Sequence, residues 1–394
     1  MEQRRMIGGG PAGLCAARHI LSRPEAFDPP VVYEMTDHLG GTWFYEEQVG
    51  TYENGYPIHS SMYRDLRTNL PKEIMMFPDF PFDDHLPSFL HHKSVQQYLE
   101  KYCEKHDIAH HIKVYVCLNS KFCVCYKLKG TENLKNRKMI IWKVLHSHSY
   151  RYPEPFTNKS VVVLGARASG VDISIEIAQV KAQVFITPTM SLPPPLGIRQ
   201  AGAVIGVSED GSLQFQDGSV IQADIVLFFT GHKFNFPFLF PSGTECTGSF
   251  CDSTVQVLAA PGFPSIFFIG ICKIICPFIH FDCQVKFALA VLEGSAELPT
   301  QEEMEKEVQR EMQRKQDTGV QVKNLLNLDK DQREYYLDMA KVGRFTPPQP
   351  VFESLYEEVR GQRQKEPQKN RQINYRLIDA TQWEILEAPP EQTD

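Results

Sequence analysis

The stretch of sequence that decides the fold runs from Arg4 to Leu14 and reads RRMIGGGPAGL. Its glycines stand at positions 8, 10 and 13, which is the GxGxxG spacing. This pattern predicts a short strand, a tight turn and a helix. In such a turn Gly8 permits the sharp change of direction, and Gly10 lets the backbone approach a pyrophosphate bound at the helix N-terminus. The predicted cofactor-binding residues of this stretch are Gly8, Gly10, Pro11, Ala12 and Gly13.

A second strand is predicted from Pro30 to Glu34, which completes a strand–loop–helix–strand unit within about 30 residues. Glu34 ends this strand, 21 residues after Gly13. A carboxylate at that place accepts hydrogen bonds from the hydroxyl groups of a ribose. The combination favours a bound dinucleotide over the alternative, which is a glycine turn with a purely structural role.

The same pattern returns later, with a strand at 160–164, a turn at 165–170, a helix at 171–180 and a strand at 182–186. Arg167 replaces the middle glycine, where its bulk could crowd a pyrophosphate and its charge could bind phosphate. The last strand ends without an acid, which permits the 2′-phosphate of NADP. A degenerate unit without a ligand is the alternative. The residues predicted to bind a nicotinamide cofactor here are Gly165, Arg167, Ser169 and Gly170.

Two such units predict an α/β fold with two Rossmann-like dinucleotide-binding domains, one for a flavin and one for a nicotinamide cofactor. We expect an NADP-binding domain at 156–231, inserted into an FAD-binding domain made of residues 1–155 and 232–394. One stretch of the latter, 113–143, is atypical, because it has seven lysines and one arginine against a single acid, Glu132. Whether this basic segment permits FAD binding is left open by the sequence.

Composition limits the class of protein. Of the 394 residues, 41 are lysine or arginine and 48 are aspartate or glutamate, so the net charge of −7 argues against a nucleic-acid-binding protein. The 10 cysteines show no CxxC pair and no companion histidine cluster, so we predict free thiols and no metal site. Neither a signal peptide nor a long apolar stretch is evident, so we expect a cytoplasmic protein without a membrane anchor.

The other elements follow from local signals. Thr300 and Glu303 form a capping box that opens a charged helix to about Lys315. The remaining predictions are a strand at 223–229, helices at 92–103, 331–340 and 351–359, and a polar, mobile linker at 361–370.

Several segments carry a resemblance to a known family. Residues 8–14 and Glu34 look like an FAD fingerprint with its acid, residues 40–43 read GGTW, and residues 63–72 read YRDLRTNLPK. These resemble segments of the class B flavin-containing monooxygenases, in particular the plant glucosinolate S-oxygenases and insect alkaloid N-oxygenases. The resemblance implies that the GGTW segment lines the flavin and that the YRDLRTNLPK segment belongs to the active site. It adds Gly41, Thr42, Trp43, Thr68 and Asn69 to the cofactor-binding residues.

Two side chains receive roles from this resemblance. In the family, the asparagine at the place of Asn69 hydrogen-bonds near the flavin C4a adduct and the nicotinamide ribose, which implies that Asn69 is catalytic. Its alternative is a turn-forming asparagine before Leu70 and Pro71. Residues 281–285 resemble a late segment that returns to the flavin domain, so Gln284 is either a flavin contact or a helix-surface amide.

The match to the family is incomplete in one place. Of its motif FxGxxxHxxxY, His146 and Tyr150 are present, but Ile140 and Trp142 replace the phenylalanine and the glycine. Residues 230–232 (TGH) are similar to the segment that joins the two cofactor domains.

The resemblance implies an NADPH-dependent monooxygenase with FAD and NADP as cofactors. NADPH reduces FAD, O₂ adds at the flavin C4a to give a hydroperoxide, and the distal oxygen passes to the nitrogen or sulfur of a small molecule. The partners are then an amine or sulfide substrate and O₂, and a homodimer is one possible assembly. The alternatives are an uncoupled NADPH oxidase and an inactive homologue that acts only by binding.

Overall fold

The computed structural model describes residues 3–53, 55, 57–116, 142–165, 168–187, 198–229, 231, 259–260, 263–320, 324–366 and 369–386. Most of the basic segment 113–143 therefore lies outside the described residues, as do Arg167, Ile140, Thr230 and His232. In the described part of the chain, no helix combines the length and the apolar character of a membrane span.

The first sheet is built from the N-terminal part of the chain. Its strands β1 (Gln3–Ile7), β2 (Asp28–Tyr33) and β3 (Ile112–Lys113) lie in this order and pair in parallel. Helix α1 (Pro11–Leu21) joins β1 to β2, and α2 (His92–Lys105) precedes β3. The first predicted strand–loop–helix–strand is thus confirmed, and we call these elements the first unit.

The second sheet is fully parallel and has five described strands in the order β4-β11-β5-β6-β7. These are β4 (Lys143–His146), β5 (Ser160–Leu164), β6 (Gln183–Thr187), β7 (Ile198–Gln200) and β11 (Ile225–Phe228). Helix α3 (Ala168–Gln179) joins β5 to β6, as predicted, and we call this sheet with α3 the second unit. Strand β4 joins it although residues 143–146 precede position 156, where the predicted domain begins.

An antiparallel meander that the sequence did not predict extends the second unit. It consists of β8 (Val204–Val207), β9 (Leu213–Phe215) and β10 (Val220–Ile221), in the order β10-β9-β8. Phe215 and Trp142 share one buried cluster with Val162 and Val226 of the parallel sheet. The Trp142 indole donates a hydrogen bond of 2.9 Å to the Gly211 carbonyl, so this departure from the family motif supports the meander.

The C-terminal part is mainly helical and covers the first unit. Its elements are β12 (Ala259–Ala260), β13 (Phe263–Phe267), α5 (Pro277–Leu292), α6 (Gln301–Asp317), α7 (Gln332–Gly343), α8 (Val351–Lys365), β14 (Asn374–Leu377) and β15 (Trp383–Leu386). Thr300 and Glu303 form the predicted capping box. The predicted linker at 361–370 is wrong in its first half, because α8 continues to Lys365. After Gly361, residues 362–365 are polar but helix-forming, and one side of the helix still packs inward.

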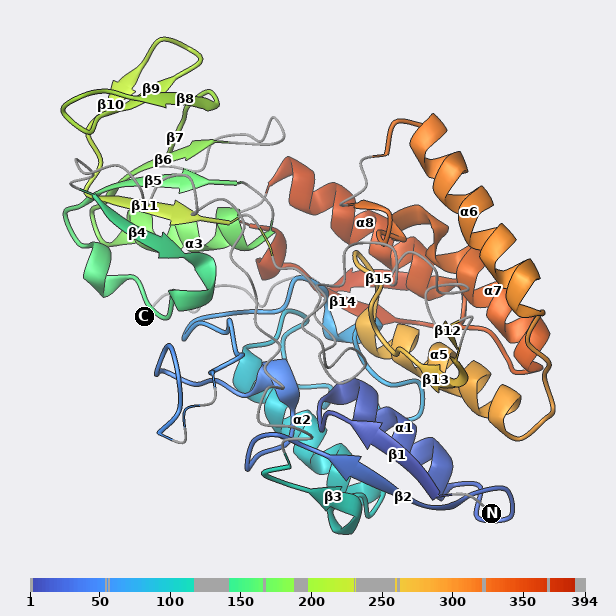
Figure 1. The fold of residues 1–394 in the computed structure, drawn as a ribbon. Coiled ribbons are helices and arrows are strands. Elements are labelled where there is room, and N and C mark those ends of the chain that lie inside the picture. Colours follow the sequence, from blue (N-terminus) through green and yellow to red (C-terminus); the bar gives the residue numbers. More distant parts are fainter. Residues whose placement is uncertain are drawn as a thin grey trace.

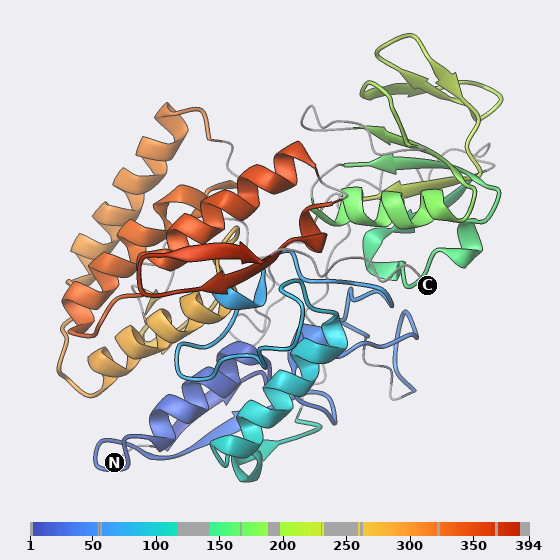
Figure 2. The same ribbon diagram turned by 180° about the vertical axis from the view of Figure 1, so that it is seen from behind.

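The two units lie at different ends of the molecule in Figure 1, with the C-terminal helices beside both. Figure 2 shows α3 and α8 approaching each other, with the short helix η8 (Asn370–Gln372) between them. Helices α1, α2 and α5 share one core, in which Phe77, Tyr98, Tyr102 and Phe278 stack. The two glycine loops therefore stand on separate hydrophobic cores.

Candidate cofactor and active site

The first glycine loop, between β1 and α1, has a backbone that other residues would disturb. Gly8 has a φ of +105°, and its N–H donates to the Tyr33 carbonyl at 2.8 Å. A Cβ on Gly13 would lie 2.0 Å from the Gly8 carbonyl oxygen, which is an impossible contact. Pro11 opens the helix, where its missing N–H is not needed. The N-terminus of α1 therefore fits the pyrophosphate of FAD.

The GGTW segment packs directly against this loop. Its residues form the short helix η1 (Gly41–Trp43), and the Gly40 N–H donates to the Gly9 carbonyl at 3.0 Å. A Cβ on Gly41 would approach the Cα of Gly10 to 3.0 Å. The structure thus brings together the two segments that the sequence predicted to meet at the flavin.

Glu34 follows β2 and is only 7% exposed. Its Oε2 accepts from the Gly9 N–H at 2.6 Å, while Oε1 accepts from the Thr36 N–H at 2.9 Å and the Thr36 hydroxyl at 2.8 Å. A carboxylate has about four lone-pair sites. Three are used by the protein, so Glu34 holds the glycine loop in place and keeps room for one further donor, such as a ribose hydroxyl.

Asn69 lies at a bend in a segment that its neighbours hold firmly. The buried Thr68 donates its N–H to the Leu90 carbonyl at 2.8 Å, and its hydroxyl accepts from the Leu90 N–H at 3.0 Å. The ammonium of Lys72 donates to three backbone carbonyls at 2.7 to 2.9 Å. The Asn69 side chain is exposed, and its Oδ1 accepts from Arg371 at 2.6 Å. The Asn69 side chain thus bonds to a guanidinium far along the chain, and its predicted catalytic role stays a prediction.

At its two described glycines, the second glycine loop repeats the geometry of the first. Gly165 has a φ of +111°, and a Cβ on Gly170 would lie 2.3 Å from the Gly165 carbonyl oxygen. Thr187 ends β6, and its hydroxyl accepts from the Gly165 N–H at 3.4 Å. Ser169 lies exposed in the first turn of α3, beside the loop. The predicted Arg167 lies outside the described residues, so its position relative to this loop stays a prediction.

Gln284 is fully buried in α5 and is not the helix-surface amide of the alternative interpretation. Its Oε1 accepts from the Gly270 N–H at 2.7 Å, and its Nε2 donates to the Tyr335 hydroxyl at 2.8 Å. Gly270 follows β13 and has a φ of +83°. Gln284 therefore fixes the turn after β13, and its predicted contact with the flavin stays a prediction.

An ionic cluster between the two units was not predicted from the sequence. Arg371 of η8 contacts Asp172 of α3 at 2.5 Å as well as Asn69. The hydroxyl of the buried Tyr63 lies 3.5 Å from the same carboxylate. No local pattern could have indicated this cluster, because Arg371 and Asn69 are 302 positions apart.

His146 and Tyr150 are the two residues of the family motif that this chain retains, and Tyr150 contacts α3 close to this cluster. The Tyr150 hydroxyl donates to Oε2 of Glu176 at 2.8 Å. Burial raises the pKa of Glu176 to about 7, even though this hydrogen bond opposes the shift. The His146 side chain accepts from the His148 N–H at 3.2 Å and ends β4. The histidine and tyrosine thus anchor the chain where it enters the second unit.

A buried group at the α1–α5 contact has the composition of a metal site. The ligand atoms of Cys15, His19 and Asp282 lie within 4.8 Å of one another. However, the two oxygens of Asp282 already contact His19 at 2.7 Å and Lys286 at 2.6 Å. Burial raises the pKa of the Cys15 thiol, which keeps it neutral. A lysine in contact with the carboxylate supplies the positive charge, so we interpret the group as a structural link between the helices.

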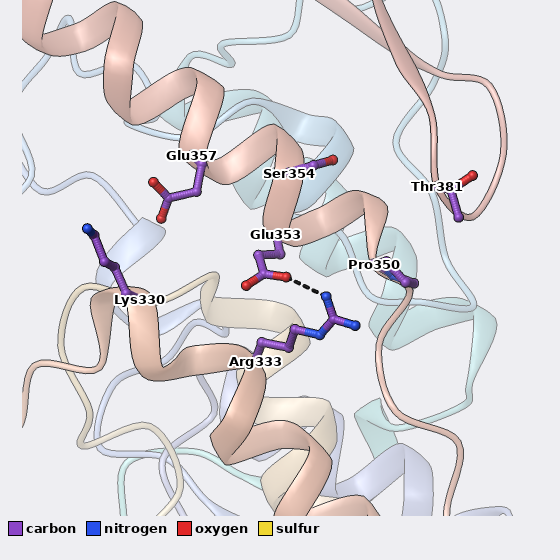
Figure 3. A pocket seen from close by; sticks show the side chains of 7 residues that line it. All are labelled: Lys330, Arg333, Pro350, Glu353, Ser354, Glu357 and Thr381. Carbon is purple, nitrogen blue, oxygen red and sulfur yellow. Dashed lines mark hydrogen bonds and ion pairs between the residues drawn. The ribbon is translucent and has the colours of Figure 1, made fainter.

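A surface hollow of about 490 Å³ lies away from these loops, among the C-terminal helices (Figure 3). Arg333 of α7 and Glu353 of α8 form an ion pair of 2.8 Å across it. Its walls contain none of the predicted cofactor residues. The hollow is therefore separate from the candidate site.

Comparison with known proteins places this arrangement in a family. The flavin-binding monooxygenase-like family model matches residues 2–129, 130–191 and 197–385. Flavin-containing monooxygenase FMO GS-OX-like 2 of Arabidopsis thaliana is 33% identical over 357 residues, which cover 76% of this chain and 75% of that protein. FMO GS-OX-like 1 of the same plant is 30% identical over 365 residues, with 80% and 77% covered.

Solved structures agree with this placement. S-allyl-L-cysteine S-oxygenase from Allium sativum superposes with a TM-score of 0.80 over 94% of both chains, at 26% identity. Tmm from Pelagibacter sp. strain HTCC7211 has a TM-score of 0.79 at 22% identity, covers 94% of this chain and 93% of its own, and shows the shared fold. With two Rossmann-like glycine loops and a match over most of its length, the chain belongs to the flavin-containing monooxygenase family, whose cofactors are FAD and NADPH.

Proposed function

We propose that this flavin-dependent monooxygenase oxygenates a sulfur or nitrogen atom of a small molecule at a site formed by the first glycine loop, the GGTW segment and Asn69. The observation that carries the proposal is that two loops have the same geometry at their first and last glycines and that the Asn69 amide is exposed. FAD, when bound, supplies the oxygen chemistry, and NADPH supplies the hydride.

The chain's own residues have a binding and positioning role in this proposal. The N-terminus of α1 and the remaining lone pair of Glu34 hold FAD, and the second loop with Thr187 receives NADPH. Asn69 presents a fixed hydrogen-bond donor to the reacting part of the cofactors, where a preorganised dipole stabilises developing charge better than water does. Substrate choice then depends on access, because no acid or base of the protein has to act on the substrate.

The substrate class is inferred from the relatives. One structural relative is, by name, an S-oxygenase of S-allyl-L-cysteine, and it shares 26% of its sequence with this chain. Sulfur and amine nitrogen are soft nucleophiles, so we propose sulfides first and tertiary amines second. As part of the same proposal we place the protein in the cytoplasm, which agrees with buried free thiols at Cys15, Cys103, Cys272, Cys276 and Cys283. A homodimer stays a prediction.

The test is Asn69→Ala in the purified full chain. We expect the variant to retain FAD, because the Asn69 side chain bonds to Arg371 and not to the glycine loop. It should lose product formation by about 100-fold, since one preorganised donor is removed. Methyl phenyl sulfide and N,N-dimethylaniline serve as probes, and NADPH consumption, product and H₂O₂ are measured together.

Asn158→Gly is the matched control. It removes an amide from a turn at a φ of +58°, which glycine adopts without strain. The control should behave like the natural protein. Unchanged product formation in Asn69→Ala would refute the role of Asn69, and a wild-type protein without FAD would refute the proposed function.

A further inference from the structure

Arg371 is the side chain that fixes the orientation of the Asn69 amide. Its guanidinium nitrogen lies 2.6 Å from Oδ1 of Asn69. Arginine has only donors, so the amide atom that it contacts must be the oxygen. The NH₂ end of Asn69 is therefore the end left for other partners. A charge-assisted hydrogen bond to the oxygen also polarises the amide and strengthens its N–H donors.

Arg371 is itself held from two sides. Its Nε donates to the Thr68 carbonyl at 3.1 Å, so it spans the backbone and the side chain of the Thr68–Asn69 segment. Its terminal nitrogen also contacts Oδ2 of Asp172 at 2.5 Å. The Asp172 side chain is 10% exposed and that of Arg371 is 22% exposed, so water competes little for the pair.

Asp172 belongs to the second unit, whereas Asn69 belongs to the segment beside the first. Asp172 stands in α3, two positions after Gly170, which closes the second glycine loop. Figure 2 shows η8, which carries Arg371, at the point where α3 approaches the rest of the molecule. Any shift of α3 relative to the first unit would therefore be felt at Arg371, and through it at Asn69.

We infer that Arg371 is a positioning residue, which presents the Asn69 NH₂ group to the cofactors, and that Asp172 makes this orientation depend on the docking of the second unit. The inference rests on the proposed function and deepens it. A lysine could not replace Arg371, because a single ammonium cannot reproduce the forked contacts to Thr68, Asn69 and Asp172.

The experiment is a double-mutant cycle in the full-length protein with FAD bound. The variants are Arg371→Met, Asn69→Ala and their combination, with Arg371→Lys as a milder change. NADP⁺ affinity is measured by calorimetric titration, and the fraction of consumed NADPH that appears as H₂O₂ is measured with methyl phenyl sulfide present. Two residues that act as one unit show strongly non-additive effects.

We expect Arg371→Met to weaken NADP⁺ binding by about tenfold and to raise the H₂O₂ fraction, since it removes a charged hydrogen bond. In the Asn69→Ala background the same change should cost no more than about twofold, because the side chain that Arg371 orients is gone. Asp172→Asn should reproduce the loss in part. Arg371→Lys should retain FAD and the unfolding temperature, yet share the loss of NADP⁺ affinity.

The control is Arg376→Met, which breaks the exposed ion pair with Glu384 on the nearby β14–β15 hairpin and should change neither quantity. Equal losses for Arg371→Met in both backgrounds would overturn the inference and leave Arg371 as a structural tie. So would unchanged NADP⁺ affinity in Arg371→Lys. Failure of the proposed function is separate, because it shows in the wild-type protein as absence of FAD or of product.

Discussion

The two glycine loops have the same geometry at their first and last glycines but differ in the side chain that faces them. Gly8 and Gly165 both have a φ above +100°, and the last glycine of each loop would collide with the first if it carried a Cβ. The side chain at the end of the following strand is Glu34 for the first loop and Thr187 for the second. Both loops therefore need glycine for the same reason, which is the positive φ of the first glycine and the close approach of the last. We predict that the strand-end residue distinguishes a ribose diol from a phosphorylated ribose.

The largest effect is expected from substituting the last glycine of each loop, because the two substitutions should weaken the binding of different cofactors. Gly13→Ala should release FAD or weaken its binding by roughly 100-fold, because the added Cβ would lie 2.0 Å from a carbonyl oxygen. Gly170→Ala, with a contact of 2.3 Å, should spare the FAD content and weaken NADP⁺ binding instead. FAD absorbance of the purified protein and NADP⁺ titration measure the two effects.

Gly361→Ala in α8 is the control, since nothing lies within 4 Å of its Cβ position. It should raise stability slightly, as expected for alanine in a helix. A Gly13→Ala protein with full FAD content would contradict the close-approach argument.

The next effect concerns one buried titratable residue in each helix that follows a glycine loop. The stability that these two residues contribute should change with pH in opposite directions. Burial raises the pKa of Glu176 in α3 to about 7, so the stability linked to its protonation is present at acidic pH and lost as the pH rises through about 7. Burial lowers the pKa of His19 in α1, so its contribution is lost as the pH falls.

Glu176→Gln should therefore be more stable than the natural protein at pH 9, by about 2 kcal/mol, and nearly equal at pH 5. The glutamine can still accept from Tyr150. Chemical denaturation at both pH values measures the difference. The same substitution at the exposed Glu302 of α6 is the control. A difference that does not depend on pH would rule out titration of Glu176 as the cause.

The smallest effect is expected from a substitution at Glu34, the residue at the strand end of the first loop. Glu34→Gln should weaken FAD binding by about tenfold, because a neutral amide accepts less strongly from the Gly9 N–H and from a ribose hydroxyl. The measurement is the equilibrium constant for FAD with the apoprotein. The control is Glu305→Gln in α6. This residue lies outside the glycine loops, so the substitution should leave the equilibrium constant for FAD unchanged. Equal affinities of Glu34→Gln and the natural protein would show that Glu34 does not contact the cofactor.

Local signals predicted most of the fold. Glycine spacing and runs of apolar residues located both parallel units, and the pair Thr300 and Glu303 marked the start of α6. Each of these depends on residues close together in the chain. The end of α8 was missed because its last residues are polar without being helix breakers.

The site was predictable only where its residues lie in a motif. The first glycine loop and the GGTW segment meet as expected, since GxGxxG and the resemblance identified them. Arg371 and Asp172 carry no motif. Arg371 contacts Asn69 across 302 positions, and Asp172 is linked to Asn69 through Arg371. Such contacts follow from packing of whole elements, which a single sequence does not encode in a readable pattern.

Residues of η8 and β14 contact residues far earlier in the chain, and this affects the order in which the protein folds during synthesis. Arg371 meets a residue 302 positions earlier, and the Tyr375 N–H of β14 bonds to Ser88, 287 positions earlier. At ordinary rates of synthesis of about 5 to 20 residues per second, roughly 15 to 60 seconds separate the emergence of Asn69 from that of Arg371. During that interval the first unit can form its own sheet, but the Asn69 segment must wait for its last partner. The proposed active site is thus completed only after η8 has emerged.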